Sequence, residues 1–327
     1  MSATEAGSVE TLKPLKTWSF RAGQRKQPNE YEIVSVNTIF RANERDKVEM
    51  SPDAPVNRWY RDYQTSSRLK HDDWDSFRDP DAVTYRAYCT QRDRDEVYVD
   101  GLLAQHAERQ HDLGLSGAWV TRLAEFYTPM RYLLHTAQMA AAYAVVMVPA
   151  STIVNCLAFQ MGDQLRWVSR VSYRTAELRN NWPDRGFGKQ ERAQWEKAPQ
   201  WQGYRELMER LLVTYDFGEF LLALNLVAMP AIDAALTQIK DQAIANDDAL
   251  TGFLIEAQLA DSARRNKWTK RLTEFLAVSP DNEKLAAEIV QRWAPIAERA
   301  IHAFAEAIRT GTGDPARTAF KASLHHN

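Results

Sequence analysis

The chain has 327 residues, of which 45% are hydrophobic and 26% charged, a composition typical of a globular protein with a sizeable core. Its 41 Lys and Arg residues nearly balance its 43 Asp and Glu residues, so the net charge of −2 gives no electrostatic reason to expect nucleic acid or an anionic membrane as a partner. Residues 1–10 contain neither a basic nor an apolar segment, so no signal peptide is expected. The longest nearly apolar run, residues 139–148, is far shorter than the ~20 residues of a membrane-spanning helix.

Residues 1–79 show no sustained periodicity and contain four prolines, which interrupt regular structure. They also contain nine aromatic residues, whereas disordered segments are usually poor in aromatics. We therefore predict an extended, aromatic-rich N-terminal arm that lies along a surface. That surface belongs either to the chain's own helical body or to a partner chain.

From Pro80 onward, apolar residues recur at helical spacing. Pro80, with acidic residues on both sides, is expected in the first turn of the first long helix. Ser151 or Thr152 is expected to cap a later helix. The predicted helices cover residues 80–111, 116–147, 151–180, 202–243, 247–277 and 281–309, with a short helix within 189–197.

Helices of this length, each apolar along one face, pack antiparallel into a bundle. The sequence therefore predicts an all-α bundle over residues 80–310, followed by a polar tail at 311–327. Gln164 and Trp167 are expected to point into the bundle interior, at the edge of an apolar stripe. This stripe consists of Val154, Leu157, Met161, Leu165 and Val168.

The residues expected to face the interior decide whether the bundle can bind metal. Ferritin-like di-iron proteins place a Glu and a His three residues apart on each of two helices, because positions i and i+3 share a helix face. In helical iron enzymes these ligands often stand in the pattern D-E-x-R-H, which we call the ligand frame. Residues 163–167 read Asp-Gln-Leu-Arg-Trp, so Gln164 replaces the Glu and Trp167 replaces the His.

A second ligand frame, at residues 261–265, reads Asp-Ser-Ala-Arg-Arg, so Ser262 replaces the Glu and Arg265 replaces the His. An amide is a weak metal ligand, an indole ring offers none, and a guanidinium group stays protonated and repels a cation. We therefore predict no metal ligand at Gln164, Trp167, Ser262 or Arg265, and no catalytic or cofactor-binding residue in the chain.

Glu108 and His111 form the only Glu-x-x-His pair in the sequence, and we interpret them as a surface pair near a helix end. His135 is interpreted as a packed core or interface histidine. Cys89 and Cys156 are interpreted as reduced, buried thiols, because they show no CxxC spacing. The basic run at residues 264–271 is interpreted as a solvated helix face or a subunit contact.

Four long segments resemble the β subunit of the hydroxylase of bacterial multicomponent monooxygenases, nearest to the toluene/aromatic branch. Residues 15–35 (LKTWSFRAGQRKQPNEYEIVS) resemble its N-terminal arm, and residues 69–88 (LKHDDWDSFRDPDAVTYRAY) resemble the entry to its first long helix. Residues 148–178 and 195–212 are also similar to its pattern. The resemblance implies a ferritin-like long-helix bundle within a cytoplasmic α2β2γ2 hydroxylase.

The resemblance also implies where the chemistry takes place. The di-iron centre that activates O2 would lie in the α subunit, and electrons from NADH would arrive through a reductase with FAD and an Fe–S ferredoxin. A small effector protein would regulate the complex. The substrate would be an aromatic hydrocarbon such as toluene or benzene, with phenol, alkenes or isoprene as alternatives.

The β subunit would then be a non-catalytic platform, with the arm wrapping the α subunits. Its former metal space would be filled by Trp167, while Arg166 and Arg264 pair with Asp163 or Asp261 across helices, since a buried charge needs a partner. Two alternatives remain. One is a stand-alone helical metalloprotein that uses Glu108, His111 and Glu219, of which Glu219 lies near the place where a single-Glu helix would contribute. The other is a helical adaptor unrelated to oxygenases.

Overall fold

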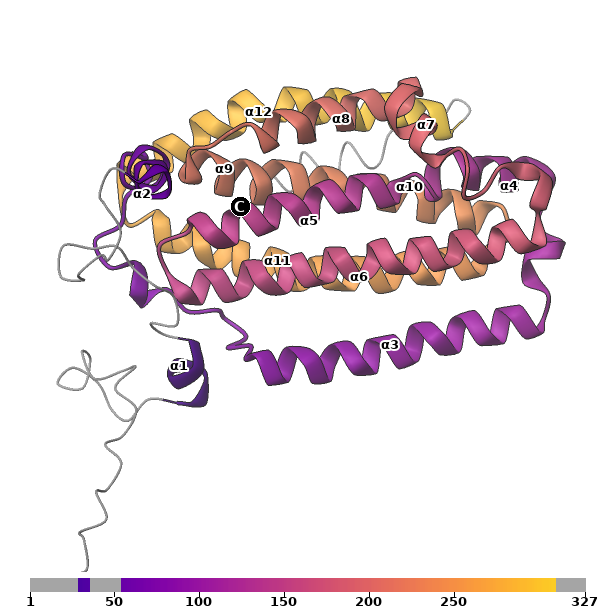
Figure 1. Cartoon of the computed structure of the whole chain (residues 1–327), viewed down its shortest axis with the longest axis horizontal. Helices are drawn as coiled ribbons and strands as arrows, with labels where there is room; N and C mark the ends of the chain where they lie inside the picture. The colour runs from indigo at the N-terminus through magenta and orange to yellow at the C-terminus, as the bar shows by residue number, and fades with distance from the viewer. Residues whose placement is uncertain (1–28, 36–53, 310–327) are drawn as a thin grey trace, which may run out of the picture.

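The structure is a computed structural model, and it describes residues 29–35 and 54–309. These residues form helices and turns without a strand, which confirms the all-α prediction. The long helices run side by side along one axis, with α8 and α12 at the top of Figure 1, α5 and α10 in the middle, and α6 and α11 below. The long helices are α3 (Tyr85–Glu108), α5 (Met130–Met147), α6 (Ser151–Asn181), α8 (Pro199–Leu212), α10 (Met229–Ala245), α11 (Ala249–Leu276) and α12 (Pro280–Ile308).

Short helical segments connect these elements or precede them. Three of them, η2, η5 and η7, are π-helical turns. The short segments are α1 (Glu30–Ser35), α2 (Pro55–Tyr60), η2 (Arg61–Thr65), η3 (Trp74–Ser76), η4 (His111–Gly114), α4 (Gly117–Arg122), η5 (Leu123–Tyr127), η6 (Pro183–Arg185), α7 (Glu191–Lys197), α9 (Phe217–Ala223) and η7 (Leu224–Ala228).

A continuous helix formed by α9, η7 and α10 runs through the centre of the bundle. Among the described residues this helix, Phe217–Ala245, is the one that is long and apolar enough to cross a membrane. However, 83% of its most apolar window is buried inside the bundle. A helix that is hydrophobic all round and buried in this way is typical of the core of a large protein.

The π-helical turn η5, between α4 and α5, accommodates Pro129. Pro129 has no N–H and cannot donate to the carbonyl of Glu125. The indole Nε1 of Trp201 on α8 donates to that carbonyl instead, at 2.9 Å. The predicted helix over 116–147 is thus confirmed in extent, with the π-helical turn η5 and Pro129 inside it.

Helices α8 and α12 approach closely at one glycine. An added Cβ on Gly203 would lie 2.6 Å from the Cα of Ala300 and 2.9 Å from its Cβ. Since real Cβ atoms essentially never come that close, the absence of a side chain at Gly203 sets the distance between the two helices. By contrast, Gly101 on α3 has nothing within 4 Å of its position for a Cβ.

Several predicted helix ends were wrong. Pro80 lies in a turn, in which Asp79 accepts from the N–H groups of Asp81 and Val83, and α3 begins after Thr84, whose side chain caps it. Helix α6 begins at Ser151 after Ala150, and no side chain caps it. The predicted helix over 202–243 is interrupted between α8 and α9, because Asp216 caps a new helix there.

The described parts of the predicted arm lie against the bundle. Tyr31 is buried, and its hydroxyl accepts from the N–H of Asp79 at 3.3 Å. The side chain of Asn282 on α12 accepts from the N–H of Lys70 and donates to its carbonyl, at 3.3 and 2.7 Å. Trp18, Phe20 and Phe40 of the arm, and the tail at 311–327, lie outside the described residues.

Candidate functional site

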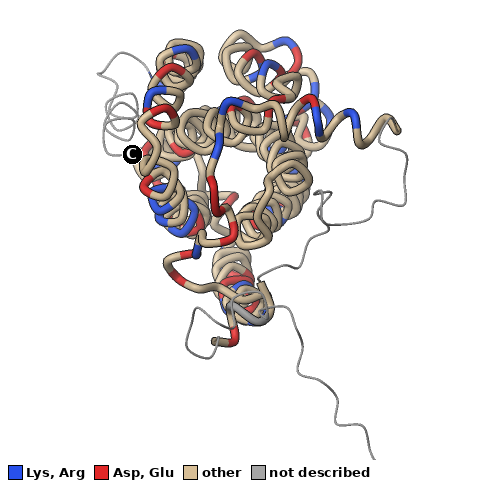
Figure 2. The backbone as a smooth tube through the Cα atoms, turned by 90° about the vertical axis from the view of Figure 1, so that its left-hand side faces the viewer, with Lys and Arg blue, Asp and Glu red and all other residues tan. Residues whose placement is uncertain are grey.

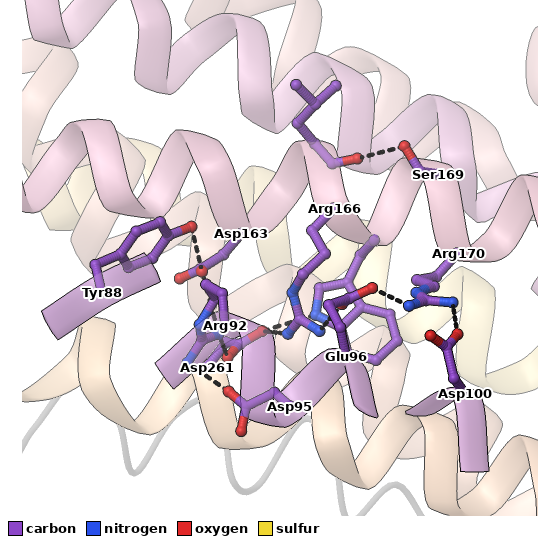
Figure 3. Close-up of polar contacts among 12 residues, drawn as sticks. Tyr88, Arg92, Asp95, Glu96, Asp100, Asp163, Arg166, Ser169, Arg170 and Asp261 are labelled. Carbon is purple, nitrogen blue, oxygen red and sulfur yellow. Dashed lines mark hydrogen bonds and ion pairs between the residues drawn. The ribbon is translucent and has the colours of Figure 1, made fainter. Parts of the chain in front are cut away.

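The two ligand frames lie beside each other on the neighbouring helices α6 and α11, at the place where α3 runs alongside them. Asp163 on α6 and Asp261 on α11 are buried, with 2% and 7% of their surface exposed. Arg92 of α3 donates from Nη1 to both carboxylates, to Asp163 at 3.2 Å and also to Asp261 (Figure 3). Tyr88 donates its hydroxyl to Asp163 at 3.0 Å.

The arginine of each frame pairs with the aspartate of the other frame. Arg166, which shares a frame with Asp163, pairs with Asp261, and Arg264, which shares a frame with Asp261, pairs with Asp163. This confirms the predicted pairing across helices. Arg166 also donates to Glu96 of α3 at 2.7 Å, so its guanidinium joins three helices.

Trp167 fills the interior beside this cluster. Its side chain is 1% exposed, and its Nε1 donates to Asp261 at 2.7 Å. The guanidinium of Arg166 stacks over the Trp167 ring, 4.5 Å from the ring centre. The prediction that Gln164 and Trp167 point inward is confirmed, since Gln164 is only 6% exposed.

The arginines of the cluster offset only part of the effect of burial on the pKa of Asp163. Burial raises the pKa of the Asp163 carboxyl, while the charges of Arg264 and Arg92 act to lower it. Burial alone would lower the pKa of Arg92, but the carboxylates of Asp261 and Asp163 raise it. Burial and the neighbouring Asp163 raise the pKa of the Tyr88 hydroxyl, so Tyr88 stays a neutral donor at pH 7.

Two residues of the second frame, Ser262 and Arg265, contact a carboxylate outside this cluster. Ser262 donates to Asp233 of α10 at 2.7 Å, and Arg265 pairs with Asp233 and with Ser262. Asp233 was not predicted as a site residue from the sequence, although it is the only charged residue between Glu219 and Lys240.

The structure separates Glu219 from the ligand frames. Glu219 accepts from Arg292 at 3.1 Å and from the Nε1 of Trp293 at 2.9 Å, both on α12. It therefore does not face the position where Gln164 and Ser262 lie. The carboxylate that does face Ser262 is Asp233.

Other assignments change. Glu108 is exposed, whereas His111 is half-buried and contacts Asp248 through Nε2 at 3.1 Å, so the two do not form a surface pair. His135 is exposed, so it is not a core residue of this chain. Cys156 is buried as predicted, but Cys89 is exposed.

A second polar network lies at the far end of α3. Arg174 of α6 is 1% exposed and forms two hydrogen bonds with Asp112, one of them at 2.7 Å. Asp248 caps α11 and accepts from Trp119 at 2.9 Å. Arg174 and Asp112 line a cavity of about 360 Å³, together with His106 and His111.

The donor atoms at the four ligand-frame positions do not fit a di-iron site. They belong to an amide, an indole, a hydroxyl and a guanidinium, and the three arginines around Asp163 and Asp261 would repel a cation. Across residues 29–35 and 54–309, no three His, Cys, Asp or Glu side chains are grouped so that they could hold a metal ion. The arrangement fits a structural role that holds α3, α6 and α11 together.

Comparisons with known proteins agree with this fold. The profile of the methane/phenol/alkene hydroxylase family matches residues 57–280. The chain is 44% identical over 299 residues to the β subunit of the hydroxylase component of the toluene-4-monooxygenase system from Ectopseudomonas mendocina, covering 91% of each chain. It is 23% identical to an oxygenase component of phenol 2-monooxygenase from Acinetobacter pittii (strain PHEA-2), covering 88% of this chain and 84% of the relative.

Solved structures show the same architecture. A structure of toluene 4-monooxygenase with toluene bound in the resting active site contains a chain that matches with a TM-score of 0.87 and 42% identity, covering 92% of this chain and 100% of that chain. A phenol hydroxylase from Pseudomonas sp. OX1 shares the fold, with a TM-score of 0.79 at 20% identity, over 98% of this chain and 94% of that one. The chain therefore belongs to the methane/phenol/alkene hydroxylase family.

Proposed function

We propose that this chain is the structural β subunit of a hydroxylase that oxidises an aromatic hydrocarbon such as toluene or benzene, and that the di-iron centre lies in a larger partner subunit. The observation that carries the proposal is the pair of ligand frames, in which an ion-pair cluster takes the place of metal ligands. The 44% identity to a toluene-4-monooxygenase β subunit supports an aromatic hydrocarbon as the substrate over phenol, because identity to the phenol 2-monooxygenase component is 23%.

The cluster gives the subunit a mechanical role. Arg92 and Arg166 each join α3 to both α6 and α11, either directly or through a shared carboxylate. Trp167 occupies the adjacent volume and is itself hydrogen-bonded. A bundle fixed in this way can act as a rigid platform for a catalytic partner.

The remaining components follow from the same proposal. The complex is an α2β2γ2 assembly in the cytoplasm, with α and γ subunits as direct partners. An effector protein binds the assembled hydroxylase. A reductase and a ferredoxin, which contain the FAD and Fe–S groups, deliver electrons from NADH to it. This chain contributes no catalytic, cofactor-binding or metal-binding residue.

Iron analysis of the complex and of its separated subunits tests the proposal. A tagged copy of the chain, purified from its source cells, should bring down a larger subunit and iron, and hydrocarbon oxidation should depend on both. After the complex is dissociated under mild conditions, iron should remain with the larger subunit. Stoichiometric iron in the isolated chain would contradict the proposal and would favour the stand-alone metalloprotein.

A further inference from the structure

The cavity of about 360 Å³ lies where α3 ends against the C-terminal part of α6. Its volume is within the range of sites that bind small organic molecules. Leu103, Ala107 and Leu250 provide apolar walls, and the exposed residues Gln110 and Asn180 belong to the lining, so a solute can enter from solvent. None of the ligand-frame residues lines this cavity, so it is separate from the ion-pair cluster.

An unusual backbone conformation brings two histidines together at this cavity. Gln110 has a φ of +51°, in the left-handed region that residues other than glycine rarely adopt. If α3 continued as a helix, His106 and His111 would point about 140° apart, because each residue turns an α-helix by ~100°. The turn at Gln110 instead places the two imidazole rings edge to face, with their centres 5.0 Å apart. Both rings line the cavity.

Hydrogen bonds fix which nitrogen of each neutral ring carries the proton. The Nδ1 of His106 lies 2.8 Å from the carbonyl oxygen of Leu102, which can only accept, so Nδ1 is the donor. The Nε2 of His111 lies 3.1 Å from the Asp248 carboxyl, whose lowered pKa keeps it an ionised acceptor at neutral pH. Each ring is then left with one nitrogen that has a lone pair, Nε2 in His106 and Nδ1 in His111. The histidine pair therefore favours a ligand that donates hydrogen bonds.

Carboxylates outnumber cations at this site. Arg174 is the one guanidinium among the described lining residues, and both of its Nη atoms are engaged by Asp112. Glu177, which also lines the cavity, accepts from Arg174 at 3.3 Å, yet burial raises the pKa of its carboxyl in spite of that neighbour. Asp248 lies directly behind His111. With neutral histidines, three carboxylates around one guanidinium leave two negative charges in excess, which attract a cation and repel an anion.

We propose that this cavity binds a small aliphatic diamine with both ends protonated. One ammonium group donates to the lone pairs of His106 and His111, the other lies at the Glu177 carboxylate, and the carbon chain contacts Leu103 and Leu250. Across the described residues, Glu177 and the two histidines do not form a group that could hold one metal ion, so they serve as two separate binding points. An ammonium group has three donors and no acceptor, which complements lone pairs and carboxylates. The proposal is independent of the chain's role as a platform.

Calorimetric titration of the full-length chain with 1,4-diaminobutane at neutral pH tests the proposal. We expect binding at a single site per chain. 1-Aminobutane, which has one ammonium group, should bind about tenfold more weakly or worse. 1,4-Butanediol, which has the same length without charge, and succinate, a dianion of similar length, should give no measurable binding.

Variants of the chain locate the site. Glu177→Gln keeps the shape of the side chain but removes its charge, and His106→Phe keeps a ring but removes the acceptor nitrogen. Each should weaken binding of the diamine about tenfold or more. Glu108→Gln removes a charge from an exposed position at the end of α3, outside the cavity lining, and should bind as the wild type does. Thermal unfolding without ligand establishes that each variant is folded.

Several results would overturn the diamine site. Equal affinities for the diamine and the diol would show that the cavity does not select for charge. Equal losses in Glu177→Gln and Glu108→Gln would mean that diffuse surface charge attracts the diamine. Unchanged binding by a folded Glu177→Gln variant, or no binding by the wild type up to about 10 mM, would also reject the site. The location of iron in the complex is measured separately, so none of these results bears on the proposed function.

Discussion

Asp163 and Asp261 hold the same place in the two ligand frames, and a single guanidinium group, that of Arg92, donates hydrogen bonds to both. Arg92 comes from α3, which lies outside the ring of helices at the bottom of Figure 2. The two frames and this third helix therefore form one electrostatic unit, whose parts depend on one another.

Replacing the shared arginine should strongly destabilise the bundle. In Arg92→Met, two buried carboxylates lose the positive charge between them, and breaking a buried ion pair in this way costs about 3–5 kcal/mol. Chemical denaturation of the isolated chain measures the effect. Arg94→Met, on the exposed side of the same helix, should change the free energy of unfolding by less than about 0.5 kcal/mol. Equal losses in both variants would contradict the role assigned to Arg92.

Trp167 should contribute through both its volume and its hydrogen bond. We expect Trp167→Ala to lower the free energy of unfolding by about 3–5 kcal/mol, because the side chain is buried and its removal leaves a cavity. Trp167→Phe keeps most of the volume but removes the donor to Asp261, and it should cost about 1–2 kcal/mol. Unchanged thermal stability of Trp167→Ala would reject the filled-core interpretation.

Asp248 should make the stability of the protein depend on pH in the acid range. Burial acts to raise the pKa of Asp248, but hydrogen bonds from His111, Thr251 and Trp119 outweigh burial and lower it. A carboxyl group whose folded-state pKa is lowered contributes stability above its unfolded pKa of about 4, and that stability is lost as the pH falls through the folded pKa.

Melting temperatures measured from neutral pH down to about pH 3 test this assignment. Asp248→Asn should lower the melting temperature at neutral pH. As the pH falls, the melting temperature of this variant should decline less steeply than that of the wild type. Asp247→Asn changes the same chemistry at an exposed neighbour and should follow the wild-type profile. Parallel profiles for Asp248→Asn and the wild type would show that Asp248 is not the source of the pH dependence.

Two glycine-to-alanine substitutions should change the free energy of unfolding in opposite directions. Gly203→Ala forces α8 away from the backbone of α12 at Ala300, and we expect a loss of about 1–3 kcal/mol, typical of overpacking. Gly101→Ala on α3 meets open space and should gain about 0.5–1 kcal/mol, because alanine restricts the unfolded chain and favours the helix. A gain at both positions would mean that the two helices separate easily.

Sequence reasoning was most successful where one local pattern determined the structure. Helical periodicity and the Pro–Gly punctuation predicted the extents of α6, α11 and α12 to within a few residues. The crossed ion pairs were predictable because each frame keeps an Asp and an Arg three residues apart while it loses its metal ligands.

Features that depend on tertiary contacts were not predictable in the same way. An apolar stripe has the same spacing whether it faces a core or a partner, so the exposure of Leu165 required the structure. Arg92 could not be linked to Asp163 and Asp261 because its helix lies far from both in sequence. The break before Asp216 was missed because the apolar periodicity continues across it.

Helix α3 joins the bundle in an unusual way. Its inner side contacts α6 through ion pairs of Arg92, Glu96 and Asp100, while only a few of its apolar residues, such as Val99 and Leu103, are buried. An attachment of this kind weakens as dissolved salt screens its exposed charges, whereas the apolar contacts among α5, α6 and α10 do not. Local opening of the native protein should therefore start at α3, whose amide hydrogens would exchange with solvent before those of the central helices, and sooner as ionic strength rises.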